Sequence, residues 1–407
     1  MIEGRDIVCV SFGAWDDMVE TPQYLMSRLA RRNRVLFVDM PVSPLEFVRG
    51  MRSPAAVRAK IAHWRRGNRQ VADKLWVAAP PPILPKRTNR HVNRLNAVIL
   101  RRWLAAQARA LGFRDVIYWN FQPRFPTLGR ALKPAVQVYY CVDDFAAAPY
   151  NWNNEAEVRA LEEIACRESD VVICTGRKLV ENRRPFNPNT HFVPEGADVG
   201  LFATAMDPGL PVPDEIARLP HPVIGYAGLV NWRIDVPLML HLARRRPEWS
   251  FALVGPVVED DRLRELLAQP NVHAFGRKAL EELPGYLKPM DVTLLPYVLN
   301  EYTHNVFPLK LYEYAAAGKP MVSTDMYEMR AYDGRQLVIG RTPEEFERRI
   351  EEALATDSPE KRAARSQSAL QNTWEHRLEA ISALVEPHLR GRGAPAQHEL
   401  SQAEAAG

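Results

Sequence analysis

Residues 305–320 read NVFPLKLYEYAAAGKP, and the interpretation of the chain starts from this stretch. Pro308 suits the first turn of a helix, because its missing N–H has no partner there in any case. Gly318 suits the left-handed residue that follows a helix, and Pro320 prevents the helix from continuing. The stretch therefore predicts a loop, a helix of about three turns and an abrupt stop.

Two charged residues lie on one face of this predicted helix. Lys310 stands in the first turn, where the helix dipole alone favours an acid, and Glu313 follows three residues later. Unpaired amide groups at a helix N-terminus attract anions such as phosphate. A bound diphosphate would account for Lys310, whereas the alternative is a solvated Lys–Glu pair worth about 0.3 kcal/mol.

The composition is that of a globular chain, with 407 residues of which 46% are hydrophobic and 25% charged. The net charge of +4 is unevenly distributed. Residues 47–114 hold sixteen Lys or Arg against one acid, Asp73, and so carry +15, which leaves −11 for the rest of the chain. Such a segment indicates an anionic partner: a membrane surface, a lipid phosphate or nucleic acid.

Two predicted helices carry much of this positive charge. Residues 54–66 combine apolar residues and a Trp with basic neighbours, a pattern typical of helices that lie on membranes. Residues 89–111 form a second basic helix with an apolar stripe, which we expect to face the core. This stripe consists of Val92, Leu95, Val98, Ile99, Trp103 and Leu104. We predict binding to an anionic membrane surface through residues 47–114, with a functionless basic surface as the alternative, and no nucleic acid partner because no nucleic-acid-binding motif is present.

The cysteines indicate the compartment. Cys9, Cys141, Cys166 and Cys174 form no CxxC pair, and most lie in or beside apolar runs. We expect buried free thiols in a reducing cytoplasm. The sequence has no run of about 18 apolar residues and does not begin like a signal peptide. We therefore expect a cytoplasmic protein, peripheral on the inner face of the cytoplasmic membrane.

Short apolar runs alternate with helical patterns along most of the chain. Continuous rather than alternating apolar strands indicate doubly wound α/β domains with parallel sheets. The proline-rich residues 207–222 look like a linker, and we place the domains at 1–203 and 204–373, with a helix at 374–390 that packs back on the first domain and a disordered tail at 391–407. We predict strands at residues 7–12, 35–39, 75–79, 116–119, 136–142, 171–175, 191–194, 223–226, 251–254, 272–275, 292–295 and 321–324.

Four motifs in this series carry a family resemblance: FVPEGADVGLF (192–202), IGYAG (224–228), AFGR (274–277) and the helix at 308–320. With the order of elements, they resemble the GT-B glycosyltransferases over roughly residues 5–390. The resemblance is to the large retaining family (group 1, family 4-like), and it is nearest to the teichuronic-acid-biosynthesis-type polysaccharide glycosyltransferases. It implies two facing Rossmann-like domains with an interdomain cleft, the first for the acceptor and the second for a nucleotide-sugar donor.

The implied activity is transfer of a sugar, with retention, from a nucleotide sugar to a saccharide or lipid-linked acceptor in bacterial cell-envelope or exopolysaccharide biosynthesis. Glu313 matches the second glutamate of the family's E-x7-E motif, which accepts hydrogen bonds from the donor ribose. Asn305 stands where the first glutamate is expected, and Glu301 or Thr303 could compensate for it. Arg233 falls near the usual lysine position. The donor-binding positions are then Gly228, Arg233, Gly276, Arg277, Thr303, Lys310, Leu311 and Glu313.

Acids in the first domain are candidates for work on the acceptor. Gly13 ends the first strand and lets a ligand approach the backbone closely, and Asp16 and Asp17 follow in the same loop. Asp143 and Asp144 end another strand that faces the same cleft. Each acid could orient or deprotonate an acceptor hydroxyl, with helix capping or a solvated turn as the alternative. The candidate catalytic residues are Asp143, Asp144 and Asn305.

Sugar transfer places negative charge on the departing diphosphate, which cations would stabilise. The sequence has no Asp-x-Asp pattern and no His/Cys metal spacing. We therefore predict a metal-independent transferase without a cofactor, in which the nucleotide-diphosphate sugar is a co-substrate. Two other functions stay open, a nucleotide-sugar epimerase and a non-catalytic nucleotide-sugar-binding protein on the same scaffold.

Overall fold

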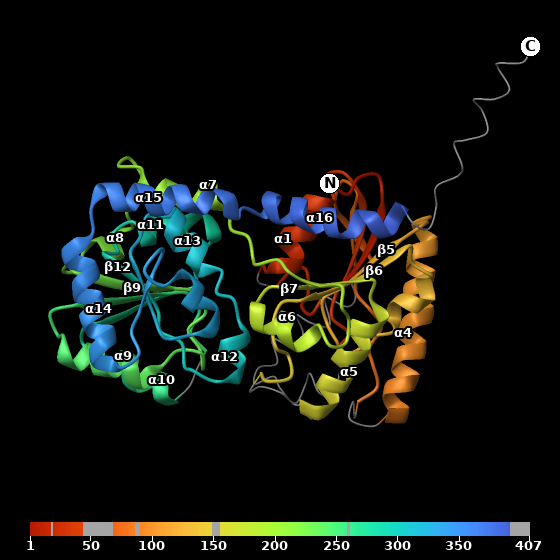
Figure 1. The fold of residues 1–407 in the computed structure, drawn as a ribbon, viewed down its shortest axis with the longest axis horizontal. Helices are drawn as coiled ribbons and strands as arrows, with labels where there is room; N and C mark the ends of the chain where they lie inside the picture. The colour runs from red at the N-terminus through yellow and green to blue at the C-terminus, as the bar shows by residue number, and fades with distance from the viewer. Residues whose placement is uncertain (18, 44–67, 86–89, 149–154, 259–260, 391–407) are drawn as a thin grey trace, which may run out of the picture. The chain divides into compact units, whose positions relative to one another are not determined.

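The chain forms two compact α/β units, each built around its own sheet (Figure 1). One unit is Met1–Val193 together with the chain from Leu378 onward, and the other is Pro194–Arg377. The computed structural model describes residues 1–17, 19–43, 68–85, 90–148, 155–258 and 261–390. The predicted helix at 54–66 and the predicted tail at 391–407 lie outside these residues.

The boundary between the units falls after Val193, where the sequence placed it after residue 203. The helix α7 (Val199–Ala203) explains the difference. Its Phe202 is buried in the hydrophobic core of the second unit, and α7 packs against α13 (Lys310–Ala316). Local sequence does not reveal this because α7 follows directly on the last strand of the first unit.

The first sheet has the order β3-β4-β2-β1-β5-β6-β7-β8. All neighbouring strands are parallel except β3 and β4, which form a hairpin. β3 was not predicted, because its polar sequence RQVA lies half-exposed at the sheet edge. The strands are β1 (Asp6–Val10), β2 (Arg34–Val38), β3 (Arg69–Ala72), β4 (Leu75–Ala78), β5 (Ile117–Asn120), β6 (Val136–Cys141), β7 (Val171–Cys174) and β8 (Thr190–Phe192). The described helices are α1 (Thr21–Leu29), α4 (Arg90–Ala110), α5 (Glu155–Glu168) and α6 (Arg177–Arg183).

The prediction that an apolar stripe of α4 faces the core is confirmed only for Leu104, which is buried, and for Trp103, which packs against the core. The side chains that pack inward are Asn96, Leu100, Leu104 and Ala108. Three members of the predicted stripe are exposed instead: Leu95 (49%), Val98 (41%) and Ile99 (37%). Asn96 fixes the rotation of the helix, because its amide donates to the carbonyl of Leu84 (3.1 Å) and its Oδ1 accepts from the Leu84 amide (2.8 Å). These two hydrogen bonds therefore decide which side of α4 faces the core, and the number of apolar residues on each side does not.

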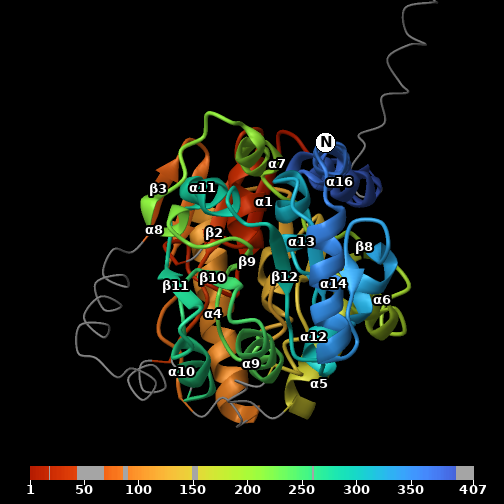
Figure 2. The same cartoon turned by 90° about the vertical axis from the view of Figure 1, so that its left-hand side faces the viewer.

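The second sheet is entirely parallel, with the order β11-β10-β9-β12-β13-β14. Figure 2 shows β11, β10, β9 and β12 side by side in this order. The predicted strands of both sheets are present, with ends that differ by at most two residues. The strands are β9 (Val223–Ala227), β10 (Ser250–Val254), β11 (Val272–Gly276), β12 (Val292–Leu295), β13 (Met321–Ser323) and β14 (Val338–Ile339).

Two groups of helices cover the second sheet. α9 (Val236–Arg245), α10 (Asp261–Leu267) and α14 (Pro343–Thr356) form one group. α7, α11 (Leu283–Leu287), α13 and α15 (Pro359–Ala369) form the other. In Figure 1, α9 and α10 are seen below β9 and β12, with α11 and α13 above them. This layering leaves the carboxyl ends of the parallel strands as the place where loops gather.

The stretch 207–222, predicted as a linker, is part of the second unit. It contains α8 (Asp214–Ala217), whose Ile216 is buried in the core. The last helix, α16 (Trp374–Arg390), contributes to both units. Its Trp374 lies against Gly196, whereas farther along the Ser382 hydroxyl accepts a hydrogen bond from the Ile2 amide (3.1 Å). The Met1 ammonium also pairs with Glu386 (3.0 Å).

Candidate functional site

Three neighbouring strands of the second sheet end in glycine turns. Gly228 follows β9, Gly255 follows β10 and Gly276 closes β11, with φ of 149°, 142° and 66°, where a side chain is disfavoured. The Gly228 amide donates to the Val254 carbonyl (2.7 Å), and the Gly255 amide donates to that of Gly276 (2.9 Å). A Cβ on Gly255 would clash with the Gly228 carbonyl, so the turns pack closely. The motifs at Gly228 and Gly276 were predicted, and Gly255 was missed although it also follows an apolar run.

Lys310 lies on the Gly228 turn. A Cβ on Gly228 would clash with Cε and Nζ of Lys310, and this Nζ lies 5.5 Å from the centre of the Tyr226 ring. In the part of the chain that the structure describes, no carboxylate lies within ion-pair distance of the Lys310 ammonium. A half-buried ammonium held against a glycine turn is arranged to receive an anion.

Arg233 brings a second positive charge to the same strand ends. Its guanidinium lies 5.7 Å from the ring centre of Trp232 and 5.4 Å from that of Tyr302. Burial raises the pKa of the Tyr226 hydroxyl well above its usual value, and Arg233 opposes this shift. Because Tyr226 also lies beneath Lys310, both cations act on one region at the end of β9.

Glu313 shares this electrostatic environment. Burial raises the pKa of its carboxyl group above the usual value, Lys310 opposes the rise and Asp198 adds to it. Asp198 belongs to the motif at residues 192–202, so this motif and α13 come together within the second unit. Hydroxyl groups that donate to the carboxylate would favour its ionised form, as a bound ribose would.

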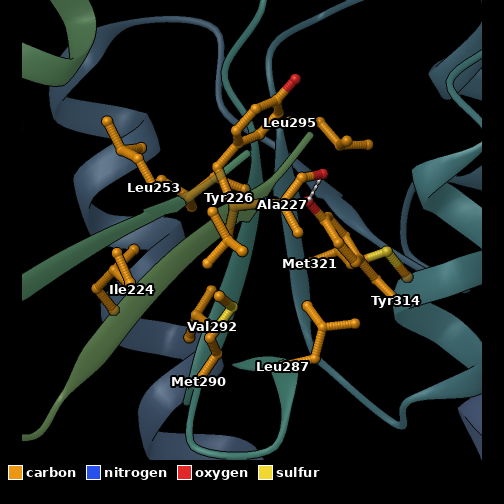
Figure 3. Close-up of a cluster of buried hydrophobic side chains, with 14 of the residues drawn as sticks. Ile224, Tyr226, Ala227, Leu253, Leu287, Met290, Val292, Leu295, Tyr314 and Met321 are labelled. Carbon is orange, nitrogen blue, oxygen red and sulfur yellow. Dashed lines mark hydrogen bonds between the residues drawn. The ribbon is translucent and has the colours of Figure 1, made fainter. Parts of the chain in front are cut away.

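Tyr314 ties α13 to the end of β9 (Figure 3). Its fully buried hydroxyl accepts from the Ala227 amide (2.8 Å) and donates to the Ala227 carbonyl (3.2 Å). Ala227 precedes Gly228, and thus this contact positions the lysine of α13 over the glycine turn. Sequence reasoning missed Tyr314 because an aromatic residue in a helix is read as ordinary core.

The end of α13 confirms the predicted stop. Gly318 has φ of 70°, and its amide donates to the Ala315 carbonyl (2.9 Å). The Lys319 amide donates to the Tyr314 carbonyl (2.9 Å), which completes the glycine-ended motif. Pro320 follows and prevents the helix from continuing.

The start of α13 differs from the prediction. The helix begins at Lys310 rather than Pro308. The Leu311 amide donates to the Pro308 carbonyl (3.1 Å) and the Tyr312 amide to that of Leu309 (3.0 Å), so these amides do not form the predicted anion cradle. The side chain of Leu311 is fully buried in the core. The predicted contact between Leu311 and the donor stays a prediction. The side chain of Lys310 is therefore the group at this place that we expect to attract an anion.

Thr303 and Asn305 lie on α12 (Glu301–Asn305), a short helix that was expected as a loop. The Thr303 hydroxyl donates to the Val298 carbonyl (2.5 Å) and accepts from the Asn300 amide (3.0 Å). These contacts give Thr303 a capping role, and its contact with the donor stays a prediction. Asn305 is buried, and its amide donates to the Glu301 carbonyl (2.9 Å).

Arg277 follows Gly276 at the end of β11 and is exposed. Gly276 touches the site through its carbonyl, which accepts from Gly255. The structure therefore brings one group of predicted donor residues to one edge of the second unit: Gly228, Arg233, Gly276, Lys310 and Glu313, with Arg277 beside them.

In the first unit, Asp144 closes a turn. Its buried Oδ1 accepts from the amides of Ala146 and Ala147 (both 3.2 Å), and Arg183 Nη2 lies 3.6 Å from the same oxygen. These contacts favour the structural alternative for Asp144. Asp143 is half-buried beside it and stays the predicted catalytic acid of this pair.

The loop after β1 holds the other predicted acids. Asp17 Oδ2 accepts from the Ala14 amide (3.2 Å), and Asp16 pairs with Arg69 (2.5 Å), so both have structural contacts. A Cβ on Gly13 would meet only Glu20 Oε2, at an ordinary 3.8 Å. The fold itself thus does not require glycine at position 13, which is compatible with the predicted approach of a ligand.

The described residues have three further properties that bear on function. No group of three or more His, Cys, Asp or Glu side chains among them could hold a metal ion, and metal independence stays a prediction. No described helix is long and apolar enough to cross a membrane. The four cysteines are free and buried, as predicted.

Comparison with known proteins identifies the second unit. Residues 222–356 match the model of the family Glycosyl transferases group 1. The second unit contains a group 1 glycosyl transferase domain. TuaH of Bacillus subtilis (strain 168), named as a putative teichuronic acid biosynthesis glycosyltransferase, is 29% identical over 238 residues. The match spans 54% of this chain and 57% of TuaH.

Solved structures show that this domain is part of a GT-B fold. Sucrose-phosphate synthase from Thermosynechococcus elongatus superposes with a TM-score of 0.68 at 14% identity, covering 96% of this chain and 100% of that one. Anabaena HepE, in complex with UDP and glucose, gives 0.60 at 15% identity, covering 93% and 98%. The predicted fold class, two Rossmann-like parallel-sheet domains, is confirmed.

Proposed function

We propose that the protein is a glycosyltransferase that moves a sugar from a nucleotide-diphosphate sugar to a saccharide or lipid-linked acceptor. The observation that carries the proposal is the Lys310 ammonium held on the Gly228 turn, with Glu313 beside it. The group 1 domain around these residues supports the same reaction class.

The two ends of the donor would meet different groups. Lys310 and Arg233 would neutralise the diphosphate as negative charge develops on the leaving group. Glu313 would accept hydrogen bonds from the ribose hydroxyls. This division needs no metal ion, and transfer in the presence of EDTA would test that part of the proposal.

A UDP-sugar is the first donor to test, because HepE was solved with UDP and glucose. We further propose retention of the anomeric configuration and an acceptor from envelope-polymer synthesis, as the name of TuaH indicates for that protein. Asp143 would orient or deprotonate the acceptor hydroxyl. NMR of the product anomer tests retention.

Thermal-shift measurements with a panel of nucleotide sugars test the donor site directly. A bound donor raises the melting temperature by mass action. We expect the shift to be lost in Lys310→Met and Glu313→Gln, and kept in Lys178→Met, an exposed lysine of the first unit paired with Glu181. A full shift in both site variants would overturn the donor assignment.

A non-catalytic binding protein is the second candidate, because Asn305 replaces the expected carboxylate. The side-chain amide of Asn305 donates a hydrogen bond to the Glu301 carbonyl within the same helix. This candidate predicts a donor-induced shift without transfer to any acceptor and without release of the nucleotide diphosphate.

A further inference from the structure

The outward side of α4 carries an apolar patch. Counting from Leu95, the positions three, four and seven residues later are Val98, Ile99 and Arg102. These spacings place the four side chains together on one side of a helix, which we call the outer face. It lies opposite Leu100 and Leu104, which pack in the core. Exposed apolar side chains that lie together on one helix face are a feature of interaction surfaces.

Cations flank the patch. Arg94 and Arg102 are exposed, and Arg109 follows farther along the same side. Within the described ranges, no carboxylate lies within ion-pair distance of these three arginines. Arg101, by contrast, is held by the carbonyl of Thr127 (3.1 Å). The outer face therefore combines apolar side chains with available positive charge.

The charge pattern selects the kind of partner. A second copy of the outer face would bring arginines against arginines, which opposes self-association. Nucleic acid would use the arginines but not the three aliphatic side chains. An anionic lipid surface uses both, because aliphatic side chains enter the interface and arginines reach the lipid phosphates.

We propose that the outer face of α4 docks on an anionic lipid bilayer. Leu95, Val98 and Ile99 enter the interface between headgroups and acyl chains, and Arg94 and Arg102 contact lipid phosphates. The proposal is independent of the proposed catalytic function, since lipid binding is measured without a donor or an acceptor.

Vesicle co-sedimentation tests the proposal. Phosphatidylcholine vesicles with and without phosphatidylglycerol are compared at low and high salt. We expect the Leu95→Ser/Val98→Ser/Ile99→Ser variant to bind anionic vesicles at least about tenfold more weakly. Arg94→Gln/Arg102→Gln should weaken binding by about fivefold per charge at low salt. The matched control is Val258→Ser/Leu299→Ser/Leu370→Ser, which removes three comparably exposed apolar side chains elsewhere.

A labelled variant gives a second measurement that does not depend on the triple variant folding. All four native cysteines are buried, so Val98→Cys offers the accessible thiol for an environment-sensitive dye. Its emission should shift to the blue on anionic vesicles, whereas that of Val258→Cys should not. Unchanged binding by the α4 triple variant, equal loss in the control, or no lipid-dependent shift at position 98 would each overturn the proposal.

Discussion

At the scale of single residues, Gly228 and Lys310 form the part of the site most sensitive to small changes. The lysine occupies the space that any β-carbon at position 228 would need. The turn also has φ of 149°, which disfavours a side chain. The methyl group of an alanine at position 228 would therefore displace the Lys310 ammonium and also strain the backbone.

Gly228→Ala should weaken donor binding by roughly tenfold or more, because it displaces the Lys310 ammonium. Gly334→Ala is the matched control, since Gly334 has φ of 71° but a Cβ there meets nothing within 4 Å. Calorimetric titration with a UDP-sugar measures the donor affinity of both variants. Equal donor affinities in the two variants would contradict the role given to the contact between Gly228 and Lys310.

Glu313 should make donor binding depend on pH. Its pKa is raised in the free protein, and ribose hydroxyls that donate to the carboxylate favour the ionised form. Binding therefore releases a proton, and affinity should fall as the pH is lowered through the raised pKa. Glu313→Gln should show weaker binding without this dependence. A wild-type profile in the variant would contradict the assigned role.

At the scale of elements, Tyr314 holds α13 to the end of β9. Tyr314→Phe leaves the buried amide of Ala227 without this partner and should cost about 1–3 kcal/mol of unfolding free energy. Tyr312→Phe, on the same helix, loses a half-buried contact with the Tyr332 hydroxyl and should cost less. Urea denaturation compares them, and a larger loss for Tyr312→Phe would contradict the argument.

The helix α5 offers a second comparison, since two of its glutamates pair with arginines at different depths. Arg183 is buried and lies 2.7 Å from Glu162, so Arg183→Met should cost about 3–5 kcal/mol by leaving that carboxylate uncompensated. Arg130 pairs with Glu168 at the surface, and Arg130→Met should cost about 0–1 kcal/mol. Similar losses of unfolding free energy in the two variants, measured by urea denaturation, would refute this ranking.

Sequence reasoning recovered the elements better than their contacts. The strands are apolar runs bounded by turn residues, so local chemistry was enough to find them, and Gly318 revealed the end of α13. The rotation of α4 depends on the hydrogen bond between Asn96 and Leu84. This tertiary contact cannot be predicted from the spacing of apolar residues along the helix. Thr303 likewise has a capping role that depends on Asn300, in a helix that was not predicted.

At the scale of the whole molecule, the proposed donor-binding residues Gly228, Arg233, Lys310 and Glu313 all belong to one of the two units. Because each unit has its own core, a ligand should stabilise the unit that binds it. We expect scanning calorimetry to resolve two transitions, with a UDP-sugar shifting mainly the one from Pro194–Arg377. A single transition, or an equal shift of both transitions by the UDP-sugar, would contradict this expectation.

The path of the chain has a consequence for synthesis. The chain leaves the first unit at Val193 and returns to it at Leu378, so the second unit is inserted within the first. A ribosome releases Pro194–Arg377 before the residues that pair with Ile2, and domains fold as they emerge. The hydrogen bond from the Ile2 amide to the Ser382 hydroxyl can therefore form only after the second unit has been synthesised. The unit whose synthesis starts first is the last to be completed.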